Sequence, residues 1–477
     1  MTLDPKANLK LCGQKLFNID AQGGNLSNLG GLLPAARLAE DTGLIHRAAS
    51  LIPEWRQPTS CTFSIELLLA QRVFLAASGH PSAIDCSNFK NDPVLKSIMA
   101  ASLNQDVLPS QSTATRLEQA ISEETIKALE DYPLQRFVRK QIHKPNSIEI
   151  YVDGTAIRTF GKQQKSTWRG GYGQTQYFPL LATTSNGELL IAQLREGGHH
   201  DSQSADTIIK LIQDLRSVWK DIKLTLVMDT GFNSPALLQQ LELLNVYYVI
   251  GYPTRSSLKS KIKDVIRTAE KDFKKRFGEP LYIGKGKAKS WQKEHQRVRS
   301  LPCKERILAE KQAAKRHVRI LYGIKHNGIK WNVDRDVVVR VDYTDKGLDI
   351  RSVVTNLEGS TADRIYENHY CKRSRIEMFI KEAKSHCKVP LSCQSFTANQ
   401  FRFTAIQGLA YMLLHELREE LPPTLKRISL ATVRDTYLNV PVLIEETERR
   451  IHWHLSSCHS AATSIIHICK KLQARTA

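Results

Sequence analysis

Four residues in the C-terminal half of the chain have the types and spacing needed to bind phosphate groups and a divalent metal ion. The stretch 361–384, TADRIYENHYCKRSRIEMFIKEAK, contains Tyr370, Arg373, Glu377 and Lys384. On an α-helix, which turns about 100° per residue, these positions fall within an arc of about 60°. A carboxylate suits Mg²⁺, Arg and Lys pair with phosphate oxygens, and a phenol adds one hydrogen bond. The solvated face of a charged amphipathic helix would show the same residues.

Two more carboxylates follow apolar runs that are typical of buried strands. Asp153 ends the run IEIYVD, and Asp229 ends the run IKLTLVMD. Acids at strand ends are common, and each alone indicates little. Together with Glu377 they make three carboxylates, which can bind two Mg²⁺ or Mn²⁺ ions about 3.5 to 4 Å apart for phosphoryl displacement. One ion would activate water or a 3′-hydroxyl, and the other would stabilise the leaving oxygen.

The elements around the two aspartates predict a mixed sheet. The runs IEIYVD, QYFPLLATT and ELLIAQL read as strands, and Asn186-Gly187 between the last two is a strong hairpin signal. A helix is predicted at about 203–219, then the strand that ends at Asp229, a helix that begins near Pro235, and the strand VYYVIGYP. The order β-β-β-α-β-α-β indicates a sheet with helices on its faces.

The segments on either side differ in character. From about residue 30 to 145, apolar residues recur at helical spacing and predict a helical domain. Its sequence LPSQSTATRLEQ reads either as a recognition helix that carries Arg116 into a DNA groove or as a capped amphipathic helix. Residues 251–330 hold 23 Lys and Arg against 7 Asp and Glu, which accounts for 16 of the chain's 20 excess positive charges. Lys274, Lys275 and Arg276 are the expected phosphate contacts there, and 317–356 reads as strands.

Composition narrows the class of protein. The chain has 477 residues, room for about three domains, and its net charge of +20 points to a polyanionic partner, with nucleic acid the first candidate. Nine cysteines without a CxxC pair are expected to be reduced thiols. The sequence shows no signal-peptide pattern and no apolar run long enough to span a membrane, so we expect a cytoplasmic protein.

Through the motifs that follow, the chain resembles the DDE transposases of bacterial insertion sequences. The branch with the signature Tyr-x2-Arg-x3-Glu-x6-Lys is matched by the four residues of the stretch 361–384. The Asp-x-Thr motif is matched at Asp153 and Thr155, and the Asp-x-Gly-Phe motif at Asp229 to Phe232. LREGGHH at 194–200 and AYMLLHELR after the signature also match. The resemblance runs from about residue 30 to 460.

The resemblance implies an α/β fold with an RNase H-like mixed-sheet catalytic core, interrupted by a β-rich insertion and preceded by a helical DNA-binding domain. The expected division is 1–145, 146–250, 251–350, 351–420 and 421–477, with the last region a candidate for dimerisation. The resemblance also implies cut-and-paste transposition in a homodimeric synaptic complex at the bacterial nucleoid. The implied partners are the terminal inverted repeats and target DNA. Cleavage would use two Mg²⁺ ions, which Mn²⁺ can replace, and a hairpin intermediate.

A hairpin-forming enzyme bends the strand sharply at the cut, and a flipped base is commonly held by an aromatic ring. The resemblance implies such a tryptophan in the insertion, and Trp291 and Trp331 are the candidates. Trp331 is favoured because IKWNVD reads as a strand, whereas Trp291 follows the run GKGKAKS. Packing on the insertion's own sheet is the alternative role.

Three other interpretations remain. A junction resolvase or another nuclease on the same core would hydrolyse DNA without strand transfer, but would need neither the signature helix nor the basic insertion. A domesticated DNA-binding protein would be expected to have lost an acid, and all three are present. A zinc cluster could be drawn from the C-terminal region, although the spacing fits no standard module: its members would be His452, His454, Cys458, His459, His467 and Cys469.

Overall fold

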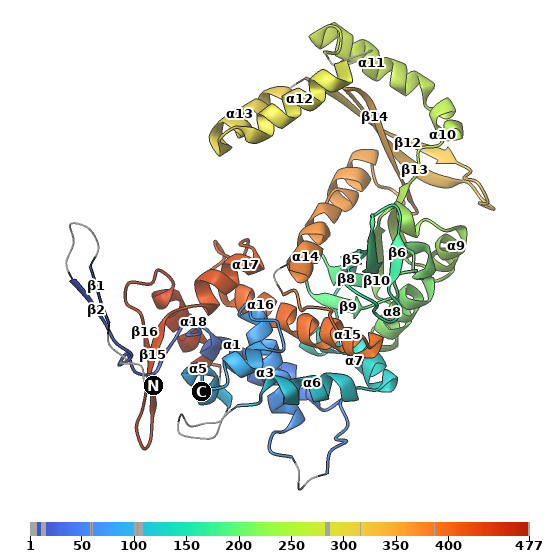
Figure 1. The fold of residues 1–477 in the computed structure, drawn as a ribbon. Coiled ribbons are helices and arrows are strands. Elements are labelled where there is room, and N and C mark those ends of the chain that lie inside the picture. The colour runs from blue at the N-terminus through green and yellow to red at the C-terminus, as the bar shows by residue number, and fades with distance from the viewer. Residues whose placement is uncertain are drawn as a thin grey trace.

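The computed structural model describes residues 7–10, 16–57, 59, 61–99, 103, 108–281, 287–314, 316–385 and 387–475. Its centre is one eight-stranded sheet (Figure 1). The strands are β4 (Ser147–Gly154), β8 (Leu180–Thr184), β9 (Leu189–Gln193), β10 (Lys223–Met228), β11 (Tyr247–Tyr252), β12 (His317–His326), β13 (Arg335–Thr344) and β14 (Gly347–Thr355). They lie in the order β12-β13-β14-β11-β10-β4-β8-β9. β10 runs parallel to both β4 and β11, and the other neighbours are antiparallel.

The core strands and helices follow the predicted order. Between β9 and β10 lies α8 (Ala205–Val218), and between β10 and β11 lies α9 (Pro235–Leu243). α9 begins with proline in its first turn, and the Ser234 side chain accepts a hydrogen bond from the Leu237 N–H. The predicted hairpin joins β8 to β9, and Gly187 in its turn has a φ of +88° that favours glycine. The α/β fold class with a mixed sheet is therefore confirmed.

Strand alternation gives the sheet two apolar faces. In β10, Leu224, Leu226 and Met228 belong to a core formed with α8 and α9. Val227 points to the opposite face and belongs to a core that includes α14 (Arg373–Ser385) and α16 (Gly408–Glu420). Because successive side chains of a strand point to opposite faces, both faces of the sheet are apolar and both are covered by helices.

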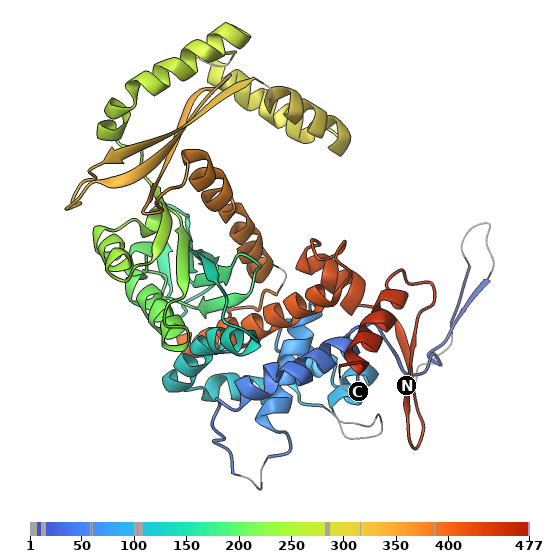
Figure 2. The same cartoon turned by 180° about the vertical axis from the view of Figure 1, so that it is seen from behind.

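The segment expected to be a β-rich insertion consists of helices followed by strands. Its first part forms α10 (Ser256–Lys261), α11 (Lys263–Phe277), α12 (Lys287–Ser300) and α13 (Cys303–Ala314). The strands predicted at 317–356 are present, but β14 pairs directly with β11, so they continue the central sheet. This pairing covers the backbone groups that β11 would otherwise expose as an edge strand. Figures 1 and 2 show α11 to α13 projecting from this end of the sheet.

The predicted N-terminal helices are present, but they share one apolar core with helices near the C-terminus. The first group is α1 (Leu32–Thr42), α2 (Leu44–Ala49), α3 (Ile65–Ala77), α4 (Asp85–Asn88), α5 (Pro93–Met99), α6 (Gln111–Ala120) and α7 (Glu123–Lys140). The second group is α15 (Phe396–Phe401), η5 (Arg402–Gln407), α16, α17 (Leu430–Val433), η6 (Arg434–Leu438) and α18 (Ala462–Gln473). The buried Glu118 side chain joins the groups, because it pairs with Arg72 at 3.1 Å and Arg402 at 2.6 Å. The predicted domain boundaries stay predictions.

Three small sheets complete the described residues. They are formed by β5 (Ile157–Arg158), β7 (Gln174–Tyr177) and β6 (Thr167–Arg169), by β16 (Ile451–Leu455), β15 (Val442–Glu446) and β3 (Leu26–Ser27), and by β1 (Ala7–Lys10) and β2 (Leu16–Ile19). His452 and His454 lie on β16, as the alternating sequence predicts, with their ring centroids 6.0 Å apart.

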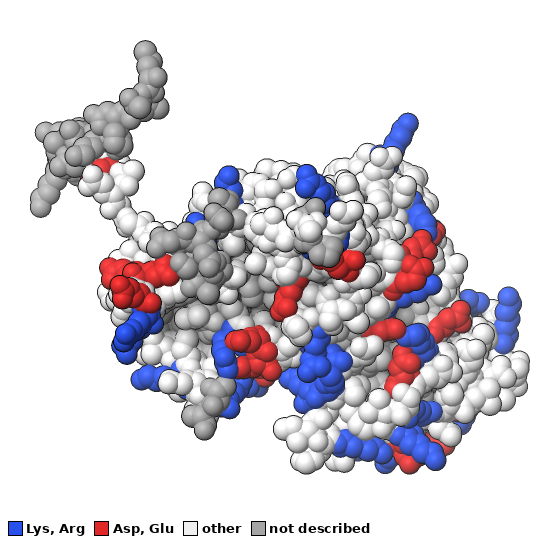
Figure 3. Space-filling view, turned by 90° about the horizontal axis from the view of Figure 1, so that it is seen from below, with Lys and Arg blue, Asp and Glu red and all other residues white. Residues whose placement is uncertain are grey.

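Three further properties bear on the expectations about charge, membrane spans and cysteines. Seen from below, the molecule shows acidic and basic side chains interspersed over one face (Figure 3). Within the described ranges, none of the helices has both the length and the apolar character required to cross a membrane. The cysteines that the structure describes are free thiols.

Candidate active site

Asp153 and Asp229 lie side by side at one edge of the central sheet. β4 and β10 are parallel neighbours, and Val152 is paired with Met228. Asp153 therefore extends from the end of β4 at the level where Asp229 follows β10. The Asp229 carboxylate accepts a hydrogen bond of 2.6 Å from the Gly231 N–H, which fixes its direction. The sheet topology thus brings together the two acids singled out in the sequence.

A further carboxylate, which the sequence reasoning missed, lies beside this pair. Asp201 begins the short helical turn η2 (Asp201–Gln203). A Cβ atom added to Gly154 would lie 1.9 Å from one oxygen of Asp201, and one added to Gly231 would lie 2.8 Å from the other oxygen. Gly154, which follows Asp153, and Gly231, two residues after Asp229, therefore leave the space that the Asp201 carboxylate fills. The only sequence signal was its position after LREGGHH.

Arg195 anchors Asp201. Its guanidinium is buried, donates from Nε to the Phe178 carbonyl at 2.9 Å, and lies 3.4 Å from the Asp201 carboxylate. An arginine held by a main-chain carbonyl is a fixed positive charge. Asp201 therefore approaches Asp229 on a rigid support.

Burial and mutual repulsion make these carboxyl groups weak acids. Burial, followed by the charge of Asp229, raises the pKa of Asp153 to about 7, while Arg373 acts in the opposite direction. Burial and Asp229 also raise the pKa of Asp201 to about 6, against the effect of Arg195. Negative charges are thus concentrated at this edge beyond what the neighbouring arginines neutralise.

Arg373 connects the strand-end acids with Glu377. Its guanidinium lies 2.8 Å from the Glu377 carboxylate and 3.8 Å from that of Asp153. Glu377 is one turn further along α14 and its side chain is 56% exposed. Arg373 and Glu377 therefore lie on one face of α14, and their roles at the site stay predictions.

Contacts at three points hold α14 over the sheet. The Phe379 ring lies against the β8–β9 turn, where a Cβ atom added to Gly187 would be 2.9 Å from it. The buried Glu382 carboxylate lies 3.3 Å from Arg418 of α16. Just before α14, the His369 ring nitrogen is 2.7 Å from Glu149 of β4. These contacts fix α14 near the start of β4, and the contact of Arg373 with Asp153 ties its first turn to the end of that strand.

Tyr370 reaches this site by a route that differs from the predicted continuous α-helix. It ends a π-helical segment, η4 (Arg364–Tyr370), in which the Cys371 N–H donates to the Tyr366 carbonyl five residues earlier at 2.8 Å. Two turn residues follow, and α14 begins at Arg373. The rotation of 100° per residue therefore does not apply across this junction. Nevertheless, the Arg373 guanidinium lies 5.7 Å from the centre of the Tyr370 ring.

Trp331 does not occupy the predicted strand. It lies in the turn between β12 and β13 and is only 8% exposed. Its ring centroid is 5.0 Å from that of Tyr252, and the Arg335 guanidinium is 5.2 Å from it. The prediction that Trp331 sits in a strand is wrong, because IKWNVD follows a turn at Gly328 instead of extending β12. These contacts are those of the packing role; Trp331 keeps a base-holding role only as a proposal.

The other predicted DNA contacts lie away from the carboxylates or beyond the described side chains. Lys274, Lys275 and Arg276 are exposed in the last turn of α11, where Lys274 also pairs with Glu270 at 3.1 Å. Arg116 is exposed on α6, at the other end of the molecule from α11 (Figure 1). The side chains of Lys384 and Trp291 lie outside the described residues.

The oxygen ligands at the sheet edge suit a divalent cation by their chemistry. Carboxylate oxygens are preferred by Mg²⁺, and the two glycines leave room for the Asp201 carboxylate beside Asp153 and Asp229. In the arrangement described, no three His, Cys, Asp or Glu side chains among the described residues are grouped to hold an ion. Glu377 is paired with Arg373 instead, so it would have to leave this partner to join the two aspartates.

Comparisons with known proteins place the whole chain. A family described as transposase DDE domain, group 1, matches residues 9–477. No curated protein matches the sequence. Among solved structures, the chain is similar to one described as the cryo-EM structure of a piggyBac transposase synaptic complex with hairpin DNA, with a TM-score of 0.41 and 10% identity over 91% of this chain and 82% of that chain. Because the family match covers nearly its full length, the chain belongs to the DDE transposase domain family, group 1.

Proposed function

We propose that this transposase binds the ends of a bacterial insertion sequence and catalyses metal-dependent cleavage and strand transfer. The observation that carries the proposal is the register of β4 and β10, which sets Asp153 beside Asp229, with Arg373 of α14 between Asp153 and Glu377. The finer assignment is cut-and-paste transposition through a hairpin intermediate. Its partners are the terminal repeats, target DNA and a second copy of the chain, in the bacterial cytoplasm.

Asp153, Asp229 and Glu377 would hold two Mg²⁺ ions, or Mn²⁺ in their place, which would activate the attacking hydroxyl and stabilise the leaving oxygen. Before a metal binds, the positive charge of Arg373 would offset the negative charges of Asp153 and Glu377, since its guanidinium lies between them. When Glu377 turns toward the aspartates, the guanidinium is free to pair with a DNA phosphate. Arginine suits this exchange because carboxylate and phosphate accept the same paired hydrogen bonds.

Tyr370 and Lys384 are proposed to contact phosphates near the cut. Phosphate contacts position a duplex without reading its sequence. Arg373 and these two residues should therefore govern the rate of cleavage more than the choice of end sequence.

Purified protein incubated with labelled element ends and Mg²⁺ tests the proposal by mapping of the cleaved strands. Asp153→Asn, Asp229→Asn and Glu377→Gln should each abolish cleavage and retain DNA binding, because an amide oxygen is a poorer metal ligand than a carboxylate. Asp264→Asn is the matched control, since that side chain is 95% exposed on α11.

Three results would each correct a different part of the proposal. Wild-type cleavage by one of the amide variants would remove that residue from the site. Cleavage without joined products would indicate a nuclease that lacks strand transfer. Specific DNA binding without cleavage would indicate a DNA-binding protein that has lost its activity.

A further inference from the structure

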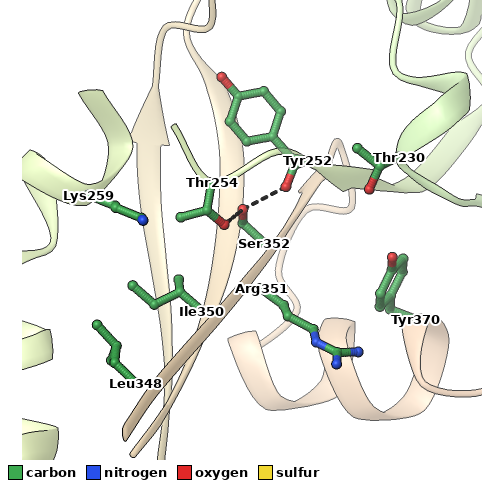
Figure 4. Close-up of a pocket in the computed structure, with 9 residues that line it drawn as sticks. All are labelled: Thr230, Tyr252, Thr254, Lys259, Leu348, Ile350, Arg351, Ser352 and Tyr370. Carbon is green, nitrogen blue, oxygen red and sulfur yellow. Dashed lines mark hydrogen bonds between the residues drawn. The ribbon is translucent and has the colours of Figure 1, made fainter. Parts of the chain in front are cut away.

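A polar cavity of about 440 Å³ is lined by Tyr370 and by Thr230, the residue that follows Asp229 (Figure 4). Its walls come from four places: the residue after Asp229, the segment from the end of β11 into α10, strand β14, and the end of η4. The cavity therefore lies where β14, from the segment expected to be an insertion, pairs with β11.

Two hydroxyl groups connect this cavity with the catalytic carboxylates. Thr230 directly follows Asp229, and Tyr370 lies three residues before Arg373. A Cβ atom added to Gly251 would lie 2.4 Å from the Thr230 hydroxyl oxygen and 2.9 Å from that of Tyr370. Both hydroxyls thus lie over the bare backbone of Gly251, at the end of the cavity next to Asp229.

The charged groups of the cavity are both cations. Arg351 and Lys259 line it, and its lining includes no carboxylate. Arg351 is 64% exposed and its only described ionic partner is Asp349, at 3.4 Å. In Figure 4 its guanidinium extends toward Tyr370. Two exposed cations without a buried acid between them favour an anionic ligand.

The hydroxyls of Ser352 and Thr254 are already used within the protein. Ser352 donates to the Tyr252 carbonyl at 2.9 Å, so its oxygen accepts the hydrogen bond of 2.9 Å from Thr254. These groups join β14 to the segment after β11. The donors that remain for a ligand are those of Arg351, Lys259, Thr230 and Tyr370.

The lining favours a sugar-phosphate backbone over a base. The Tyr252 ring points out of the cavity in Figure 4 and packs on Trp331, so it offers no surface for base stacking. Leu348 and Ile350 supply a small apolar wall opposite, which suits a sugar ring. The volume exceeds that of one phosphate group and lies within the range of ordinary ligand sites, about 300 to 1,000 Å³.

We propose that this cavity binds the DNA backbone next to the scissile phosphodiester, with Arg351 and Lys259 holding phosphate groups of the strand as it leaves the carboxylates past Thr230 and Tyr370. This inference rests on the proposed function and adds two residues outside the signature. Their task is to fix the position of the strand.

The test combines protein variants with neutral phosphates. Short end duplexes are prepared with a single methylphosphonate at each position flanking the cut, and binding is measured in EDTA at several salt concentrations. For the wild-type protein, one or two positions should weaken binding when neutralised. Arg351→Ala should abolish the effect at one of them, and Lys259→Ala at another. Each variant should also reduce the slope of log affinity against log salt by about 0.9.

Two controls separate this site from general charge. Lys210→Ala removes an exposed cation on α8 that pairs with Asp131 and should leave every methylphosphonate effect unchanged. Arg351→Lys keeps the charge and should restore most of the sensitivity. Thermal melting confirms that the variants fold.

The outcomes distinguish the two proposals. Wild-type sensitivity at every position in both Arg351→Ala and Lys259→Ala would overturn the cavity's role while leaving cleavage untouched. Loss of sensitivity as expected, in a protein that never cleaves DNA, would support the cavity and overturn the proposed activity. Absence of any methylphosphonate effect in the wild type would overturn the cavity assignment outright.

Discussion

At the scale of single residues, the site is a set of acids with too little positive charge around it. Asp153 and Asp201 both have raised pKa values, and Asp229 contributes to each shift after burial. Asp153 and Asp229 could be predicted from the sequence because each ends an apolar strand. Asp201 could not, since its place depends on the space left by Gly154 and Gly231 after folding.

The pKa shift of Asp153 predicts how the metal-free protein responds to pH. A carboxyl whose pKa is raised from 3.8 to about 7 by folding stabilises the protein fully below pH 4 and loses that contribution as pH rises through 7. The melting temperature in EDTA should therefore fall between about pH 4 and pH 7 and level off above pH 7. Asp153→Asn should flatten this fall, because an amide does not ionise.

Calorimetry or fluorescence melting of both proteins measures the difference. Each pKa unit corresponds to about 1.4 kcal/mol, so a loss of a few kcal/mol is expected from Asp153, with a smaller share from Asp201. Asp264→Asn serves as the exposed control. The same pH dependence of the melting temperature in wild type and Asp153→Asn would show that folding does not raise the pKa of Asp153.

At the scale of elements, regular patterns predicted well and junctions did not. The strands and helices of 147–252 follow from alternating or helical apolar spacing and from the turn at Gly187. The π-helical end at Tyr370 has no such pattern, because the register of main-chain hydrogen bonds leaves no mark in side-chain spacing. Strand pairing was also hidden: nothing local indicates that β14 pairs with β11.

Trp331 lies in a turn and packs against neighbouring side chains, so we expect it to contribute to stability. Its ring fills the space between Tyr252, His326 and Arg335. Trp331→Ala should lower the unfolding free energy by about 3 to 5 kcal/mol, as large-to-small changes in a core do. Chemical denaturation measures this loss, and Trp168→Ala is a control because that residue is 64% exposed.

A fully stable Trp331→Ala variant that nicks DNA but fails to form hairpins would favour a base-holding role instead. A variant that loses stability and nicking together supports packing. Trp331→Phe should recover part of the stability in the second case.

At the scale of the whole molecule, charge and mass are unevenly distributed. The helices α11 to α13 project from one end of the sheet (Figure 2). They carry half of the excess positive charge of 251–330, which is 8 of 16 charges. Composition predicted this concentration. Its projection from the body depends on how β12 to β14 extend the sheet, which composition does not encode.

This distribution predicts a salt effect that arises far from the carboxylates of the candidate site. Neutralising Lys274, Lys275 and Arg276 together should reduce the slope of log affinity against log salt by as much as about 2.7, or 0.9 per lost phosphate contact. The reduction should be smaller if Lys274 keeps its pairing with Glu270 on DNA. Equilibrium titrations with non-specific duplex measure the slope, and an unchanged value would mean that this surface does not meet DNA.

The ion pair between Glu118 and Arg402 has a consequence for protein synthesis. Glu118 is buried early in the sequence, yet Arg402, one of its two partners, is translated 284 residues later. Until that arginine leaves the ribosome, α6 carries an acid whose burial would cost several kcal/mol without full pairing. The N-terminal helices should therefore remain open to chaperones and proteases throughout translation, and products of early termination should be degraded before they compete with the full-length protein for DNA.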